Sequence, residues 1–241
     1  MLPLRDHLPT RTFPFINFAL IAANVIVFVF QVDALAQGVS EEAFARQWGL
    51  VPARLFGDPI GAIPTVVTSM FMHGSVAHIL GNMLYLWIFG DNVEDAMGHG
   101  RYLLFYLAGG MCAAAAQVLA NPMSSLPMVG ASGAIASVLA AYVFLYPSSP
   151  ITVINPVPLL WLFWGLFLYF PAWLVIGLWF IVNLWDALVN TAQGGVAFMA
   201  HVGGFIGGAA LWRAFVSGRN RVADYTPWQR LAKPRRPREW R

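Results

Sequence analysis

The sequence predicts an all-α polytopic membrane protein. Of its 241 residues, 59% are apolar and only 10% are charged, whereas roughly a quarter of the residues in an ordinary soluble domain are charged. Apolar runs of about 20 residues recur along the chain, and each is long enough to cross a hydrocarbon core of roughly 30 Å as a helix. A membrane β-barrel would instead show short segments of alternating polarity, and the sequence has none. These observations exclude a soluble globular domain.

The order of the apolar runs predicts six transmembrane helices. The expected spans are residues 13–30, 70–89, 102–120, 131–146, 171–185 and 196–215. The polar connections include a long loop at 31–64, a charged turn at 91–101 and a loop at 121–129. From residue 151 to residue 185 no residue is charged, but three prolines interrupt this stretch. We interpret residues 151–168 as largely interfacial and count one span after them.

Basic residues gather at the two ends of the chain. Nine of the fourteen Lys and Arg residues lie from Arg213 onward, and Arg5 and Arg11 precede the first span. By the positive-inside rule both termini are expected in the cytoplasm, which requires an even number of crossings. We therefore expect, in a cell membrane, a cytoplasmic N-terminus (1–12), a six-helix membrane domain (13–217) and a basic cytoplasmic tail (218–241).

The basic tail allows two interpretations. A basic segment beside a membrane span anchors the topology and contacts anionic lipid. A run of basic residues also occurs in arms that bind nucleic acid. We favour the anchor, and therefore expect the lipid bilayer, and no nucleic acid, as a partner of this segment.

The alternation of the spans brings several polar residues to one depth. Spans two, four and six all begin at the face of the membrane opposite the termini. His73 and His78 lie near the start of span two, Ser132 near the start of span four, and His201 about one turn into span six. Because polar groups within a bilayer carry a free-energy penalty, they usually face the protein interior and mark function.

Ser132 lies in a Gly-Ala-Ser-Gly sequence at residues 130–133. Gly130 and Gly133 remove side-chain bulk beside the hydroxyl and allow another backbone to approach closely. This pattern is typical of a nucleophile site. The alternative is a helix contact through small residues, which continue along the same span and favour helix packing in membranes.

His201 precedes two overlapping small-xxx-small patterns. Gly203 with Gly207 and Gly204 with Gly208 allow tight packing on a neighbouring helix. The small-residue partner is span four, and close approach would bring the imidazole within the roughly 2.6–3.2 Å that general-base activation of a serine requires. The alternative for His201 is a structural hydrogen bond between helices.

His78 and Asn82 are four residues apart and therefore share one helix face. Two side chains on one face can direct hydrogen-bond donors at one point, as a tetrahedral oxyanion requires. The backbone N–H of Ser132, at a helix N-terminus, supplies a third donor. Hydrogen bonding between helices remains the alternative for both side chains.

A metal site and a catalytic triad are weaker interpretations. His73, His78 and His201 could gather around zinc, but the sequence has no HExxH motif. We therefore expect no metal, and for His73 a structural bond in a loop. Asp186 could orient His201 as a third triad member, but its place at the end of span five is more typical of a cap or loop residue.

These motifs, in this order, resemble the rhomboid family between about Thr68 and Gly208. The matching stretches are residues 68–73 (TSMFMH), 78–82 (HILGN), 130–135 (GASGAI) and 200–204 (AHVGG). The resemblance implies a six-transmembrane-helix bundle, a catalytic dyad of Ser132 (nucleophile) and His201 (general base) without an acid, and an oxyanion hole from His78, Asn82 and the Ser132 backbone amide.

The chain departs from the family pattern at two places. A Trp-Arg pair that family members often carry before the matched threonine is replaced by Pro64 and Thr65. Many members also have an aromatic residue one turn after the serine, packed on the histidine, where this chain has Ala136. Because of the second departure, the sequence does not show which side chain packs against His201.

The expected function is intramembrane serine endopeptidase activity on transmembrane segments of membrane proteins, near the face opposite the termini and without a cofactor. The alternative is a catalytically inactive relative that binds membrane helices. A transporter is disfavoured because the chain has no visible inverted repeat. The sequence does not define the oligomeric state.

Overall fold

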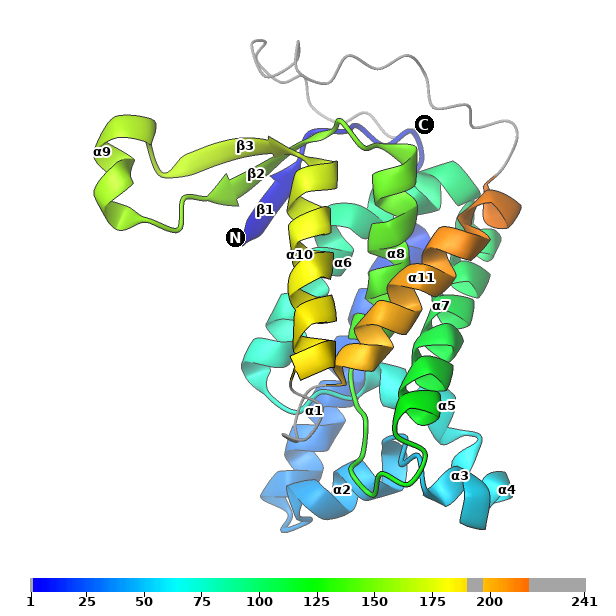
Figure 1. Ribbon diagram of the computed structural model, residues 1–241. Helices are drawn as coiled ribbons and strands as arrows, with labels where there is room; N and C mark the ends of the chain where they lie inside the picture. Colours follow the sequence, from blue (N-terminus) through cyan, green and yellow to red (C-terminus); the bar gives the residue numbers. More distant parts are fainter. Residues whose placement is uncertain (1, 190–196, 217–241) are drawn as a thin grey trace.

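The computed structural model describes residues 2–189 and 197–216, and most of them are helical. Six long helices form a bundle (Figure 1): α1 (Phe15–Ala36), α6 (Val76–Met97), α7 (His99–Ala120), α8 (Ser132–Leu145), α10 (Ala172–Val189) and α11 (Phe198–Phe215). Short helices connect them: α2 (Glu41–Trp48), α3 (Arg54–Gly57), α4 (Pro59–Ala62), α5 (Thr65–Thr68), η1 (Ser69–Phe71), η2 (Pro158–Leu160) and α9 (Trp161–Trp164). The predicted helical class therefore holds for the bundle.

Helix α8 lies in the centre of the bundle. It contacts α6, α7, α10 and α11, and all of its residues from Gly133 to Tyr142 are buried. Small side chains dominate this helix, so its neighbours approach closely. With 14 residues it is about 21 Å long, shorter than a hydrocarbon core of roughly 30 Å. The chain before it rises from the far end of α7 toward the middle of the bundle, where Ser132 begins α8 (Figure 1).

Three helices are long and apolar enough to cross a membrane: α1, α7 and α10. A fourth candidate is a broken span, in which the segment Pro59–Phe71 and helix α6 are bent by 76° at a short break. Helix α8 is apolar but shorter. The described residues thus support a polytopic membrane fold with three or four candidate spans, and the count of six crossings remains a prediction.

A small antiparallel sheet, which the sequence analysis did not predict, lies at the end of the bundle where the chain begins (Figure 1). Strand β2 (Pro150–Ile154) pairs with β1 (Pro3–Asp6) on one side and with β3 (Phe167–Pro171) on the other. The uncharged run from residue 151 contains β-branched residues at 151–154, a strand signal that its continuous hydrophobicity concealed. Part of the expected interfacial segment is therefore a β-hairpin.

The predicted charged turn at 91–101 is mostly helical. Helix α6 continues to Met97, and α7 begins at His99, so Gly98 alone, with φ of +82°, separates the two helices. Helix α6 can continue because its acidic residues are satisfied inside the protein. The fully buried carboxylate of Glu94 accepts hydrogen bonds from the backbone N–H groups of Ile16 and Asn17 at the start of α1, where the helix dipole favours negative charge.

Candidate active site

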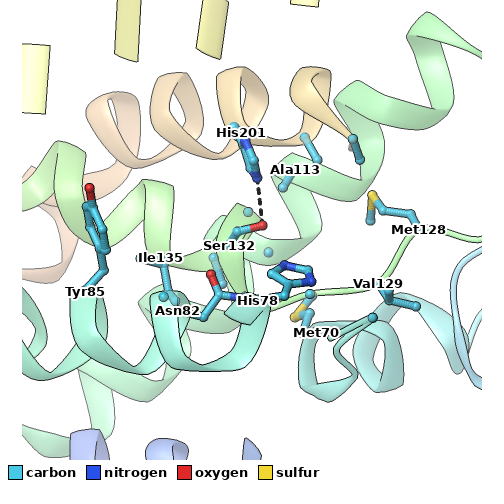
Figure 2. A pocket seen from close by; sticks show the side chains of 18 of the residues that line it. Met70, His78, Asn82, Tyr85, Ala113, Met128, Val129, Ser132, Ile135 and His201 are labelled. Carbon is cyan, nitrogen blue, oxygen red and sulfur yellow. Dashed lines mark hydrogen bonds between the residues drawn. The ribbon is translucent and has the colours of Figure 1, made fainter. Parts of the chain in front are cut away.

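A cavity of about 530 Å³ opens at the end of the bundle away from the sheet. It is lined by residues of α6, α8, α10 and α11 and of the loop before α8. Ser132, His201, His78 and Asn82, the four side chains that the sequence suggests for catalysis, all line it (Figure 2).

Ser132 and His201 are in direct hydrogen-bond contact in this cavity. Ser132 Oγ lies 2.7 Å from His201 Nε2, although the two residues are 69 positions apart in the chain. Ser132 is the first residue of α8, and His201 lies one turn into α11. The structure thus brings together the two side chains that the sequence suggests as nucleophile and general base, at a distance suited to proton transfer.

The close approach of α8 and α11 depends on glycines. A Cβ atom at Gly204 would lie 2.0 Å from the carbonyl oxygen of Gly133, and one at Gly208 would lie 2.5 Å from the Cα atom of Ser137. A Cβ at Gly133 itself would lie 2.5 Å from the Cβ of Ala113 in α7. Larger residues at these positions would separate the helices and lengthen the Ser132–His201 contact.

Asn183 of α10 contacts the other nitrogen of His201, and the sequence analysis missed it. Its Oδ1 lies 2.5 Å from His201 Nδ1, while its Nδ2 donates to the carbonyl oxygen of Trp179 at 2.8 Å. Because Nδ2 is used in this way, Oδ1 faces the imidazole and accepts from Nδ1–H. The lone pair of Nε2 is then directed at the Ser132 hydroxyl, as a general base requires.

A signal for Asn183 was present in the sequence. It is the one amide side chain in the otherwise apolar segment 172–185, and polar residues within a membrane span usually mark function. The sequence analysis weighed Asp186 instead, because a carboxylate is the familiar partner of a catalytic histidine. Two helices had to be placed side by side before Asn183 could be recognised.

Ala136 and Trp179 explain how His201 is packed although the chain lacks an aromatic residue one turn after Ser132. Ala136 is completely buried, and its Cβ would lie 3.3 Å from a Cβ at Gly204. A larger side chain there would therefore push α11 away. The indole of Trp179 lies against the imidazole instead, with ring centroids 5.8 Å apart.

Asn82 carries an unused hydrogen-bond donor. Its side chain is only 8% exposed, yet its Nδ2 has no hydrogen-bond partner among the described residues. Buried polar groups are almost always paired, so an orphaned donor requires an explanation. Figure 2 shows the Asn82 side chain beside Ser132. A substrate oxygen that entered the cavity could satisfy this donor.

His78 is held near the same point by its helix and by a glycine. The hydroxyl of Ser75 caps α6 and accepts from the backbone N–H of His78 at 3.1 Å. Gly130 has φ of +130°, and a Cβ there would lie 2.9 Å from the His78 ring and 3.5 Å from Ser132 Oγ. Gly130 therefore provides both the backbone conformation and the space that bring the His78 ring close to the serine.

His73 lies behind His78 and outside this group. The two rings are 5.1 Å apart, and Gln31 of α1 holds the backbone of His73 through its Nε2, which donates to the His73 carbonyl oxygen at 2.7 Å. His73 thus belongs to the loop before α6. Within residues 2–189 and 197–216, no group of three or more His, Cys, Asp or Glu residues is placed to hold a metal ion.

Comparisons with known proteins match a family model and several curated proteins. The model described as "Rhomboid domain" matches residues 61–218. Rhomboid protease GluP of Bacillus subtilis is 39% identical over 33% of this chain and 15% of its own length. RHOMBOID-like protein 12, mitochondrial, of Arabidopsis thaliana is 27% identical over 67% of this chain and 49% of its own length. The human Presenilin-associated rhomboid-like protein, mitochondrial, is 29% identical over 56% of this chain and 34% of its own length.

The names of these relatives contradict the expected location. Most of the curated relatives are named as mitochondrial, in plants, animals and yeast. These names contradict the prediction of a cell membrane with cytoplasmic termini, which is therefore wrong. Hydropathy and terminal basic residues indicate that a chain crosses a bilayer, but they do not distinguish one bilayer from another.

The extent of the family match decides what the chain is. The matched region of 158 residues (61–218) is more than half of the chain and contains all four groups that converge on the cavity. The chain spans about half or less of the length of the relatives described above. The rhomboid family includes serine proteases that act within membranes. The chain belongs to the rhomboid family.

Proposed function

We propose that this protein is an intramembrane serine endopeptidase that cleaves transmembrane segments of membrane-protein substrates. The observation that carries the proposal is the 2.7 Å contact between Ser132 Oγ and His201 Nε2 in a cavity within the helix bundle. The family, which includes serine proteases that act on transmembrane substrates, supports the same reaction.

In the proposed mechanism, His201 Nε2 removes the hydroxyl proton of Ser132 as Oγ attacks a peptide carbonyl carbon. The new C–O bond forms a tetrahedral intermediate, whose oxyanion accepts hydrogen bonds from Asn82 Nδ2, the Ser132 backbone N–H and the His78 ring. Collapse breaks the C–N bond, and the protonated His201 donates its proton to the leaving amine. A water molecule, activated by His201, then hydrolyses the acyl ester and restores Ser132.

The donors of the oxyanion site come from two helices. Ser132 is the first residue of α8, so its N–H belongs to the group that a helix leaves without an intrahelical partner. Asn82 supplies its orphaned amide from α6. Such preorganised donors stabilise developing negative charge strongly, because they need no reorganisation as the reaction proceeds.

The substrate must reach this cavity as an extended chain. A transmembrane helix satisfies its own backbone hydrogen bonds, so its carbonyl carbons are not open to attack. We therefore infer that a substrate segment unwinds locally at the cavity end of the bundle. Trp179 of α10 lines the cavity, and displacement of α10 would open a lateral path from the lipid.

The test is labelling of the purified protein with a fluorophosphonate probe, together with cleavage of a generic transmembrane substrate in vesicles. We expect the wild type to label and cleave, and Ser132→Ala and His201→Ala to do neither while keeping the wild-type melting temperature. Ser137→Ala is the matched control, because Ser137 lies on the same helix, is fully buried and donates to the Ala134 carbonyl. It should retain labelling.

The rival function is that of an inactive relative that binds membrane helices. A folded wild type that neither labels nor cleaves, but retains a transmembrane peptide in vesicles, would contradict the protease proposal and favour the rival. Cleavage that persists in Ser132→Ala would contradict the assigned nucleophile.

A further inference from the structure

The β2–β3 hairpin leaves the bundle sideways, at the end opposite the candidate active site (Figure 1). Its strands pair from Pro150 with Pro171 to Ile154 with Phe167. Beyond the paired strands the chain forms η2 and α9, and we call residues 157–167 the hairpin tip. This unit contributes no residue to the cavity, so an inference about it is independent of the proposed function.

The surface of the hairpin tip is apolar and aromatic. The large exposed side chains, with their exposed fractions, are Leu159 (74%), Trp161 (42%), Leu162 (87%), Phe163 (75%), Trp164 (64%) and Phe167 (48%). No charged residue occurs between residues 151 and 185. Contiguous exposed apolar surface of this kind marks a site of contact with another molecule or with a membrane.

Several polar groups of the tip are paired within the hairpin. Asn155 is central: its N–H donates to the carbonyl oxygen of Leu166, its Nδ2 to that of Gly165, and its Oδ1 accepts from the N–H of Val157. Its carbonyl oxygen accepts from the indole N–H of Trp161 at 3.0 Å. A segment that enters lipid must pair its polar groups internally, and these bonds pair several of them while apolar side chains remain exposed.

The hairpin leads directly into a candidate membrane span. Strand β3 ends at Pro171, and α10, a candidate membrane span, begins at Ala172. The strands extend away from this point across the direction of the helices (Figure 1). Five residues of strand cover roughly 17 Å, so the tip lies well beside the bundle, where lipid surrounds a monomer.

We propose that the hairpin tip inserts into the lipid leaflet at the end of the bundle that carries the sheet, which we call the terminal end. There the tip acts as an interfacial anchor. Tryptophan and apolar side chains favour this zone of a bilayer. Lipid fits the tip better than a soluble protein does, because the tip has no charge and continues directly into a membrane span. The anchor fixes the depth and tilt of α10, which also supplies Trp179 to the cavity wall and Asn183 to His201.

The test uses the full chain in phosphatidylcholine vesicles. Its single cysteine is replaced (Cys112→Ala), and a new cysteine (Leu162→Cys) carries an environment-sensitive fluorophore. Two reference positions bracket the result: Ile181→Cys on the exposed face of α10, and Glu41→Cys on α2. We expect the Leu162 label to lose about half or more of its emission in lipids brominated high on the acyl chain, and to resist aqueous iodide, as the Ile181 label does.

Two outcomes would overturn the proposal. One is iodide quenching at Leu162 equal to that at Glu41, which would place the tip in water. The other is protection that disappears when the protein is diluted tenfold with lipid, which would show that a second copy covers the tip. A repeat with Phe163→Cys guards against a local effect of one label, since this side chain is also exposed.

Discussion

Helix α6 uses buried polar groups in opposite ways at its two ends. At the terminal end, Asp6 of β1 accepts from Asn92 of α6 at 2.6 Å and from Tyr142 of α8 at 3.0 Å. Glu94 accepts from two backbone N–H groups of α1. At the cavity end, Asn82 lies on the same helix as Asn92, but its amide nitrogen is unpaired.

The difference separates groups that hold the fold from groups that await a ligand. A buried polar network that is fully paired fixes the elements it joins. An unpaired buried donor lowers stability and is retained where a reaction needs it. Helix α6 contains both kinds. Asn82 and Asn92 are about 15 Å apart along it, by the rise of an α-helix. The comparison therefore predicts opposite responses to equivalent substitutions.

The largest contrast is expected between Asn82→Ala and Asn92→Ala. Asn82→Ala should lower kcat by about 10²- to 10³-fold, the loss typical of one oxyanion donor, with no loss of thermal stability. Asn92→Ala should lower the free energy of unfolding by about 1.5–3 kcal/mol, because it removes a hydrogen bond to a carboxylate, and should leave kcat per folded molecule unchanged. Cleavage assays and thermal melts of both variants measure these effects. Equal losses of stability in both would contradict the comparison.

The sequence predicted which polar residues lie around the cavity better than it predicted the contacts at the terminal end. Motifs around Ser132, His201, His78 and Asn82 indicate their chemistry through residue type and spacing, and the structure places all four around one cavity. Asn183 could not be assigned from spacing, since its relation to His201 depends on how α10 packs beside α11.

The fold was predictable where hydrophobicity alone decides it. The apolar runs located α7, α8, α10 and α11 to within about four residues, because length and apolarity distinguish a membrane helix. Helix α1 ends six residues later than expected, and α6 begins six residues later and ends eight residues later. The small sheet was missed because β1 has four residues and no alternation, and because an uncharged run looks the same for a strand or a span. The extension of α6 through Glu94 was missed because its partners lie on α1, 77 or more positions away.

A second contrast concerns two glutamates, one buried and one exposed. Glu94 is fully buried, whereas the side chain of Glu42, paired with Arg46 on α2, is 73% exposed. Glu94→Gln should lower the free energy of unfolding by about 3 kcal/mol, because two backbone donors of α1 lose a charged acceptor. Glu42→Gln should change it by less than about 0.5 kcal/mol. Denaturant or thermal unfolding in detergent tests both, and a similar loss in the two variants would refute the assigned role of Glu94.

Two glycines with positive φ sharpen the comparison further. A Cβ at Gly98, between α6 and α7, would meet no atom within 4 Å, whereas one at Gly130 would press on the His78 ring. Gly98→Ala should therefore lower stability by about 1–2 kcal/mol through backbone strain alone. Gly130→Ala should carry the same strain and also lower kcat by about tenfold or more, since small displacements of catalytic groups are costly. A normal kcat in folded Gly130→Ala would argue against His78 as an oxyanion donor.

The smallest effect is expected at Asn183, which acts on the reaction only through His201. Asn183→Leu removes the acceptor of the Nδ1 proton, so the imidazole is no longer held with Nε2 toward Ser132, and kcat should fall by about tenfold with little change in KM. Asn183→Asp keeps an acceptor oxygen at the same position and should restore most of kcat. Steady-state cleavage of one substrate by the three proteins separates the two parameters. A purely structural role would instead lower the melting temperature of both variants, and the aspartate would not rescue the rate, because a buried carboxylate would disturb packing more than leucine does.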